Sequence, residues 1–318
     1  MDKEKGQVDS KRLVLIDGNA IMHRAYHALP PLTGRNGQLL NAVYGFTTML
    51  FKVINDLKPR YLIVAFDTGK PTFRQAEYLG YQSKRPHMDE ELSGQFPLVL
   101  ELLEAMGIPV MTKEGFEADD VIGTLARKAA KGKNQVDEVV IVSGDRDLLQ
   151  LVNDKTKIFM PVKGISEAEL VNPERVKEKM GVPPESVVDF KGLTGDASDN
   201  YPGVPGIGPK TAIQLLEKYK TIDNLYRNLE NVRKEFGENI FEKLKEGEDL
   251  AKLSRKLATI IVQVPVEFNP QKSLFEFREK EREKIIKKLE EWRFKSIIER
   301  LKPKKTARGK NDLQERLF

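Results

Sequence analysis

Short apolar runs alternate with amphipathic stretches over the first half of the chain. Three runs have the length and composition of buried strands: LVLI (13–16), YLIVAF (61–66) and EVVIVSG (138–144). Three segments between or beside them have helical periodicity: 41–57, 96–107 and 118–130. Strands that alternate with helices in this way are typical of a parallel sheet. We therefore expect an α/β fold, with a mostly parallel central sheet flanked by helices, over residues 12–175.

The second half of the chain has a different pattern. Beyond about residue 175, strand-like runs become rare and helix-like segments dominate, so residues 176–301 are predicted to form a helical domain. In residues 285–301, Ile285, Leu289, Trp292 and Ile298 keep roughly helical spacing. This segment is predicted as one amphipathic helix, with the single Trp in its core-facing stripe.

The distribution of charge along the chain limits the possible functions. Residues 1–11 are polar, and the basic tail 302–318 is apolar only at its end, so both are predicted to be flexible. The tail carries 6 − 2 = +4 of the net charge of +5, which leaves 5 − 4 = +1 for residues 1–301. Nucleic-acid binding by this nearly neutral body would need segregated charges, with basic grooves beside an acidic pocket.

Cysteine, membrane spans and secretory signals are all absent from the sequence. Without cysteine the chain has no disulfides and no thiolate chemistry. No apolar run approaches the length of a membrane span, and no secretory signal is visible at the N-terminus. We therefore expect a cytoplasmic chain without a membrane partner, and a monomer.

Each of the three predicted strands ends at an aspartate: Asp17, Asp67 and Asp145. In parallel sheets, ligands bind beyond the carboxyl ends of the strands. Aspartate is also a common turn former and helix N-cap, which is the alternative interpretation of each residue taken alone. Its recurrence after all three strands predicts an acidic edge of the sheet.

Six further carboxylates stand at predicted helix starts or turns: Glu117, Asp119, Asp120, Asp147, Asp196 and Asp199. Acidic residues in a first helical turn also complement the helix dipole, so this alternative stays open. If the nine carboxylates converge, they cannot all stay ionised without cations. Oxygen ligands favour Mg²⁺ or Mn²⁺, and His23, His27 and His87 are too scattered for a zinc site. Two such ions about 4 Å apart would clamp the attacking and leaving oxygens of a phosphodiester, with water as the nucleophile.

A Gly/Pro-rich turn follows the last two carboxylates in LTGDASDNYPGVPGIGPKTA (193–212). It holds Gly203, Gly206 and Gly208, and Lys210 then opens a predicted helix. The turn resembles a helix-hairpin-helix, whose amides and helix N-terminus bind backbone phosphate. Such binding is salt-sensitive and largely independent of base sequence. An ordinary Gly/Pro loop is the alternative.

A second basic stretch is KPTFRQAEYLGYQSKRPH (70–87). Arg74, Tyr78, Tyr81 and Arg85 fall at i, i+4, i+7 and i+11, which is one face of a helix. Aromatic and guanidinium groups on one face suit stacking on single-stranded nucleic acid. Alternatively, the tyrosines belong to the core and the arginines are solvated. Spacing alone leaves both interpretations open.

Taken together, these motifs resemble the flap endonuclease family, in particular the 5′-nuclease domain of bacterial DNA polymerase I. The resemblance covers roughly residues 12–301 and rests on these motifs: LVLIDGNAIMHRAYHALP, NAVYGF, AFDTGKPTFR, EGFEADDVIGTLA, SGDRDLLQL and LTGDASDNYPGVPGIGPKTA. It implies removal of nucleotides or flaps from the 5′ ends of branched duplex DNA, with RNA primers as further substrates. It also implies that all nine carboxylates hold divalent metal.

The resemblance assigns the basic residues as well. It implies a helical arch over about 70–105 that passes a single-stranded 5′ end, with Arg74 and Arg85 as phosphate contacts. It further implies that residues 191–220, Lys191 among them, hold the duplex, with K⁺ in the hairpin turn. One position departs from the family pattern Tyr-Lys-x-x-Arg-Pro, because Gln82 follows Tyr81 here. Lys84 could substitute for the missing lysine, but it would lie on a different helical face.

The end of the chain is the second departure, since the family's polymerase domains do not follow. The chain is a free-standing nuclease or an excised fragment, and its ending favours the first. Gln314, Leu317 and Phe318 resemble the Gln-x-x-Leu-Phe peptides that dock on the bacterial sliding clamp, so a clamp is a predicted partner.

Two rival functions remain open at this point. One is a nuclease of the same architecture that acts on RNA. The other is a structure-specific DNA-binding protein without catalysis, for which Gln82 is the support in the sequence. A protein of the second kind would hold flap DNA equally well with or without Mg²⁺, and leave it uncut.

Overall fold

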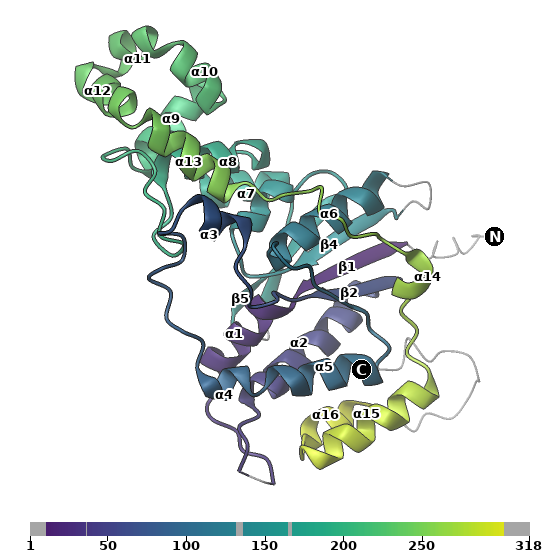
Figure 1. Cartoon of the computed structure of the whole chain (residues 1–318). Helices are drawn as coiled ribbons and strands as arrows, with labels where there is room; N and C mark the ends of the chain where they lie inside the picture. The colour runs from purple at the N-terminus through teal and green to yellow at the C-terminus, as the bar shows by residue number, and fades with distance from the viewer. Residues whose placement is uncertain (1–10, 36, 132–135, 165–166, 302–318) are drawn as a thin grey trace, which may run out of the picture.

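The computed structural model describes residues 11–35, 37–131, 136–164 and 167–301. Its centre is a six-stranded sheet in the order β3-β2-β1-β4-β5-β6. Figure 1 labels β1, β2, β4 and β5 of this sheet. The strands are β1 (Arg12–Asp17), β2 (Tyr61–Ala65), β3 (Val110–Met111), β4 (Glu138–Val142), β5 (Thr156–Lys163) and β6 (Glu167–Val171). All neighbours pair in parallel except β5 and β6, which are antiparallel. The predicted mostly parallel α/β sheet is confirmed.

The two faces of the sheet are covered by different helices because successive side chains of a strand point to opposite faces. Val14 and Ile16 pack in one core with α1 (Gly18–Ala28), α2 (Asn41–Leu57) and α5 (Phe96–Ala105). Leu13 and Leu15 pack in the other core, with α6 (Ala118–Lys131). Figure 1 shows α6 on the opposite side of the sheet from α2 and α5.

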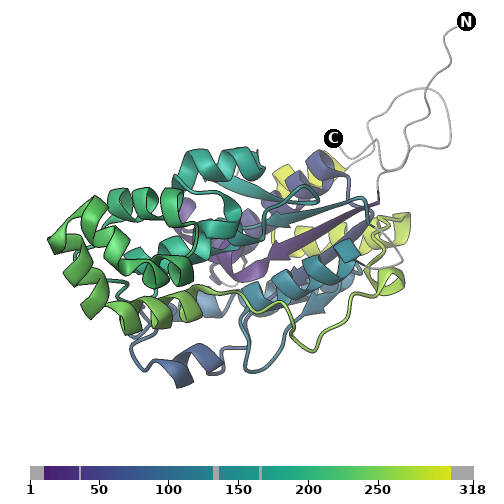
Figure 2. The same cartoon turned by 90° about the horizontal axis from the view of Figure 1, so that it is seen from above.

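The helical region extends from one end of the sheet (Figures 1 and 2). Its α-helices are α7 (Pro173–Met180), α8 (Val187–Thr194), α9 (Pro209–Tyr219), α10 (Ile222–Arg227), α11 (Leu229–Phe236), α12 (Glu238–Glu246) and α13 (Glu248–Ala258). Two 3-10 helices also occur, η1 (Asp147–Leu151) and η2 (Pro184–Ser186). Leu193, Leu215 and Leu216 join the same apolar core as the α6 face of the sheet. This continuous core fixes the helical region against the sheet.

The last described helices return to the sheet. They are α14 (Pro270–Ser273), α15 (Glu279–Glu291) and α16 (Lys295–Leu301). The Phe275 N–H donates to the Arg60 carbonyl at 2.9 Å, and Ile285 and Leu289 are buried in the core around α2 and α5. Residues 270–301 were expected in the helical domain, but their apolar stripe packs on the α/β domain instead.

The predicted single helix over 285–301 is wrong. α15 ends at Glu291, and Arg293 takes a left-handed φ of 61° before α16 begins. This turn lets Phe294 enter the core at 2 % exposure. Trp292 does pack against that core, as its place in the apolar stripe predicted.

The predicted helical arch over 70–105 is also wrong for its central part. The segment contains α3 (Phe73–Glu77), α4 (Glu90–Ser93) and α5, and residues 78–89 between α3 and α4 are irregular. We call residues 78–89 the strap. α3 ends because Tyr78 is extended, with φ −141° and ψ 108°. Further along the strap, Gln82 has a φ of 54° and Pro86 lacks a backbone donor, so no helix forms there either. Arg74, Tyr78, Tyr81 and Arg85 therefore do not share one helical face.

Within the described residues, none of the helices is both long and apolar enough to cross a membrane.

Candidate active site

A cavity of about 1230 Å³ opens beyond the carboxyl ends of β1, β2 and β4, under the strap and beside α6 and α8. Eight of the nine predicted carboxylates line it: Asp17, Asp67, Glu117, Asp119, Asp145, Asp147, Asp196 and Asp199. The parallel order of the strands brings Asp17, Asp67 and Asp145 to one edge, as their positions after strands predicted.

Asp17 and Asp67 also accept hydrogen bonds from backbone N–H groups at the starts of helices, which is close to the alternative role that the sequence left open. The Ala20 N–H donates to Asp17 Oδ1 at 2.9 Å, so Asp17 is the N-cap of α1. The Ala118 N–H donates to Asp67 Oδ1 at 2.7 Å at the start of α6. Ser143 Oγ donates to the other Asp17 oxygen at 2.7 Å. These contacts fix both carboxylates while the side chains still line the cavity.

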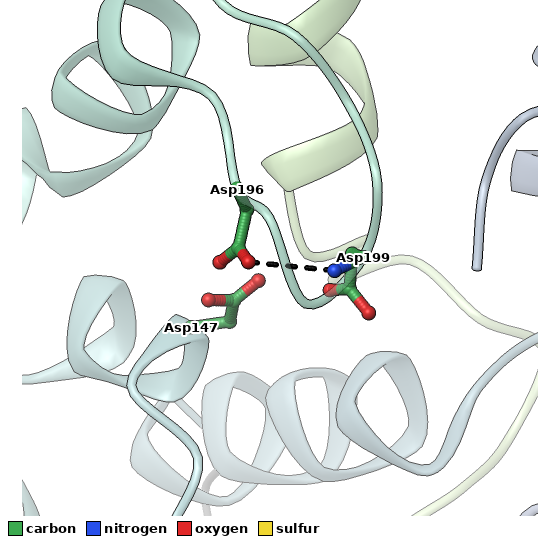
Figure 3. Close-up of side chains that lie close together, drawn as sticks. All are labelled: Asp147, Asp196 and Asp199. Carbon is green, nitrogen blue, oxygen red and sulfur yellow. Dashed lines mark hydrogen bonds between the residues drawn. The ribbon is translucent and has the colours of Figure 1, made fainter. Parts of the chain in front are cut away.

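A second group of carboxylates lies where η1 meets the loop after α8. Asp147, Asp196 and Asp199 each offer an oxygen, and these oxygens lie within 4.8 Å of one another (Figure 3). Three half-buried carboxylates at this separation form an all-oxygen donor set, which fits a hard divalent cation such as Mg²⁺ or Mn²⁺. A zinc site would prefer nitrogen or sulfur ligands.

Lys191 lies inside this group rather than on a DNA-facing surface. Its side chain is 8 % exposed, and its Nζ lies 2.8 Å from Asp196 Oδ2 and also contacts Asp147. The sequence-based assignment of Lys191 to duplex binding therefore does not fit its position. Its ammonium group balances part of the carboxylate charge.

Asp120 was predicted as a metal ligand, and the structure corrects this. Its side chain is fully buried, and both oxygens bind Arg74 at 2.8 Å. The Ile261 N–H donates to Oδ1 at 2.8 Å, and the Glu117 N–H donates to Oδ2 at 3.1 Å. Asp120 is thus paired with Arg74 in the protein interior and is not among the described residues that line the cavity.

The same ion pair corrects the prediction for Arg74. This side chain is 3 % exposed, and it also donates to the carbonyls of Leu257 and Thr259 at 2.9 and 3.0 Å. A guanidinium with this set of partners holds α3, α6 and the segment after α13 together. Arg74 borders the cavity and also lies 3.3 Å from Glu117 Oε2, but its nitrogens already bind protein oxygens, which does not fit the predicted role of a phosphate contact.

Tyr81 belongs to the core, as the alternative interpretation proposed. It is 5 % exposed and stacks on Tyr201 with ring centroids 6.5 Å apart. Its hydroxyl donates to Glu117 Oε2 at 3.2 Å, and Thr72 Oγ1 donates to Glu117 Oε1 at 3.1 Å. Tyr81 thus orients a cavity carboxylate instead of stacking on nucleic acid.

The remaining strap residues differ in their access to the site. Arg85 is exposed and lines the cavity, where its charge lowers the pKa of His23, after the larger effect of burial. Lys84 is exposed and is not among the described residues that line the cavity, while Tyr78 is half-buried. Of the strap cations, only Arg85 keeps the predicted position.

Two contributors were missed by the sequence reasoning. His23 lines the cavity from α1, and Ser143 holds Asp17. A signal existed for both, since Ser143 precedes Asp145 at a strand end and His23 lies within two turns of Asp17. Neither pattern is specific enough to be chosen without the tertiary structure.

Burial is the main reason why the cavity carboxylates resist ionisation. It raises the pKa of Asp17 to about 7 and that of Glu117 to about 7, and it raises the pKa of Asp67, Asp119, Asp145 and Asp199. Neighbouring carboxylates add to the effect at Asp17 and Asp119. At Asp196 burial acts in the same direction, but hydrogen bonds from Lys191 and Ser198 outweigh it and lower the pKa.

The metal-free protein should therefore lose stability as pH rises from about 4 to about 7. In this window the folded state holds protons on Asp17 and Glu117 that the unfolded state has released, so raising the pH favours unfolding. Thermal denaturation in EDTA should give a higher midpoint at pH 5.5 than at pH 8. Mg²⁺ should raise the midpoint more at pH 8 than at pH 5.5, and the opposite order would contradict a cation site here.

The Gly/Pro-rich turn connects α8 to α9. Gly203 has a φ of 63°, and its N–H donates to Ser254 Oγ at 2.9 Å. A Cβ at Gly203 would lie 2.2 Å from the Gly195 nitrogen, so the turn requires glycine there. Gly206, Gly208 and Lys210 are exposed, and Gly208 is the N-cap of α9. The turn thus presents the start of α9 to solvent.

Fold and site together define a class: an α/β nuclease with an acidic, metal-type cavity at the sheet edge and a helical region attached to it. The family model of the 5′-3′ exonuclease N-terminal resolvase-like domain matches residues 12–181. That of the 5′-3′ exonuclease C-terminal SAM fold matches residues 182–283. The chain belongs to the 5′-3′ exonuclease family.

Relatives with known names support this membership. The chain is 44 % identical over 293 residues to DNA polymerase I of Bacillus subtilis, with 92 % of this chain and 32 % of the relative covered. It is 42 % identical over 294 residues to DNA polymerase I of Caldicellulosiruptor bescii, with 91 % and 33 % covered. The chain thus spans about a third of the length of these relatives.

Solved structures share the fold at low sequence identity. T5 5′-exonuclease with bound zinc ions has a TM-score of 0.64 and 20 % identity, with 88 % of this chain and 98 % of that chain covered. The catalytic core of Rad2 in complex with DNA substrate has a TM-score of 0.58 and 18 % identity, with 90 % and 88 % covered.

Proposed function

We propose that the chain is a structure-specific 5′ nuclease that hydrolyses phosphodiester bonds at the 5′ ends and flaps of branched or nicked DNA. The observation that carries the proposal is the convergence of eight carboxylates on one cavity at the sheet edge. A site of this kind is stable in its ionised form only with cations. Membership of the 5′-3′ exonuclease family and the metal- and DNA-bound descriptions of the T5 and Rad2 structures support the same function.

The carboxylates divide into two sets that would hold Mg²⁺ or Mn²⁺. One surrounds the strand ends and consists of Asp17, Asp67, Glu117, Asp119 and Asp145; the other consists of Asp147, Asp196 and Asp199. Bound divalent ions supply Lewis-acid stabilisation of phosphate charge and lower the pKa of water. Hydrogen bonds from backbone N–H groups fix Asp17 and Asp67 in the first set, and Lys191 balances charge in the second. Arg85 offers the cavity a positive charge for an incoming phosphate.

The exposed turn before α9 is the proposed contact for duplex DNA. Gly206, Gly208 and Lys210 lie at its surface, where backbone amides and the helix N-terminus suit phosphate. K⁺ in this turn and RNA primers as substrates stay predictions. The predicted clamp peptide with Gln314, Leu317 and Phe318 lies outside the described residues and also stays a prediction.

The test of the function is cleavage of a 5′-labelled double-flap DNA in Mg²⁺, in Mn²⁺ and in EDTA. We expect release of the flap with either metal and none with EDTA. Equally tight binding of the flap DNA under all three conditions, without any cleavage, would overturn the nuclease and favour the binding-only alternative.

Replacing Gly203 with alanine should damage the duplex-binding turn. The added Cβ meets backbone atoms of Gly195 and Thr194, and overpacking of this kind costs about 1–3 kcal/mol or more. We expect a lower thermal midpoint and weaker binding of duplex DNA by fluorescence anisotropy. Gly208→Ala is the control for the steric clash in the thermal measurement alone, because its Cβ would meet nothing within 4 Å, while Gly208 itself belongs to the proposed DNA contact. Equal midpoints for the two variants would contradict the prediction.

A further inference from the structure

The strap is attached to the loop that follows Asp196 by a compact set of contacts, which we call the clip. The clip consists of residues 80–83 and 199–201. The Gln82 N–H donates to the Asp199 carbonyl at 2.8 Å. Asn200 Nδ2 donates to the Gly80 carbonyl at 2.7 Å and to Ser83 Oγ at 3.0 Å. The rings of Tyr81 and Tyr201, one from each side of the clip, stack on one another.

The side chain of Gln82 extends the clip into the cation site. Its Nε2 donates to Asp199 Oδ1 at 3.0 Å. Asp199 is one of the three carboxylates whose oxygens lie within 4.8 Å of one another. The strap therefore holds, through one amide, a side chain of the proposed metal set.

Both sides of the clip carry backbone strain. Gln82 has a φ of 54° and Asn200 a φ of 56°, and the described residues include only three other non-glycine residues with positive φ. Such conformations are uncommon for residues other than glycine and persist where surrounding contacts impose them. The two strained residues meet at the contact between strap and loop, beside the cavity.

We infer that Gln82 is a positioning residue, which fixes Asp199 for a cation and thereby couples the docking of the strap to metal binding. The inference rests on the proposed function, because it assigns a cation to Asp199. A neutral amide orients the carboxylate without cancelling its charge. A lysine whose ammonium group took the place of this amide would add a second positive charge, besides that of Lys191, to this carboxylate set, and the added charge would oppose the cation. Because coupling is reciprocal, the cation in turn stabilises the docked strap.

The test uses Gln82→Met, Gln82→Lys and Asn200→Gly, with Mn²⁺ binding measured by calorimetry in the absence of DNA. Loss of a partner that orients a metal ligand costs about 10–100-fold in metal affinity, so we expect at least about 10-fold weaker binding for both Gln82 variants. Asn200→Gly removes the bonds to Gly80 and Ser83, and glycine accepts the positive φ. It leaves the side chain of Asp199 intact but should also weaken Mn²⁺ binding. Gln271→Met, at an exposed position of α14, is the matched control and should bind as the wild type does.

Hydrogen exchange of the amides of residues 80–83 gives the reciprocal measurement. We expect Mn²⁺ to slow this exchange in the wild type and to have a smaller effect in Gln82→Met. Wild-type Mn²⁺ affinity in Gln82→Met and Gln82→Lys, in a protein that still cleaves flap DNA, would overturn the inference and leave the proposed function intact. A wild-type protein that neither binds Mn²⁺ nor cleaves would overturn both.

Discussion

Replacing Asp119 with asparagine should lower the rate of metal-dependent flap cleavage by more than about 100-fold, because loss of a residue that merely orients a metal ligand already costs about 10–100-fold. Asp119 lies in the first turn of α6 and lines the cavity. Burial and the charges of Asp145 and Asp17 raise its pKa well above the usual range. Asparagine has nearly the same shape but no charge to offer a cation.

A measurement of stability separates the loss of metal-dependent cleavage from misfolding of the variant. The metal-free Asp119→Asn protein should be at least as stable as the wild type at pH 8, since the substitution removes a buried charge among like charges. Single-turnover cleavage and denaturation in EDTA measure the two properties. Asp154→Asn, at an exposed position outside the cavity, is the charge-matched control and should leave both unchanged. Cleavage by Asp119→Asn at a rate comparable with the control would remove Asp119 from the metal set.

Replacing Asp120, the next residue, should have the opposite effect, a large loss of stability rather than a direct loss of metal binding. Asp120→Asn should lower the free energy of unfolding by about 3–5 kcal/mol, the usual cost of breaking a buried ion pair on one side. It would leave the guanidinium of Arg74, 3 % exposed, without its carboxylate partner. It would also turn an amide N–H₂ towards donors that now bind Asp120 oxygens. Urea denaturation measures the loss.

A double substitution provides the control for this prediction. Arg74→Met combined with Asp120→Leu removes both charges, and the loss of stability should be smaller than the sum of the two single losses. An Asp120→Asn protein of normal stability that had lost Mn²⁺ binding would contradict the structural role. It would restore Asp120 to the metal ligands that the sequence suggested.

Local pattern was sufficient for the elements that are apolar and regular. β1, β2 and β4 follow from continuous apolar runs, and α2 and α6 follow from helical periodicity. β3 and β6 were missed for a physical reason, whereas β5 was missed although its apolar residues Ile158–Pro161 are buried. β3 has two residues, and β6 is a partly exposed edge strand whose polar residues break any apolar run.

The strap shows where local pattern fails. Regular spacing of Arg74, Tyr78, Tyr81 and Arg85 suggested a helical face, but the strap is irregular and Tyr81 is buried against Tyr201. The partner of Tyr81 lies 120 residues along the chain, and so does the partner of Gly80. Spacing within one segment cannot report contacts of this kind.

The sequence by itself determined the sheet type and the acidic edge, because strand ends and helix starts are local properties that the parallel topology then gathers. It offered nine candidate carboxylates without separating the eight that line the cavity from the one that does not. Only the tertiary structure decided which carboxylates face the cavity. Asp119 and Asp120 are neighbours in one helix turn, and a rotation of about 100° between successive residues sends one to the cavity and the other to Arg74. The same holds for Lys191 and Gln82, whose roles come from partners that the fold brings beside them.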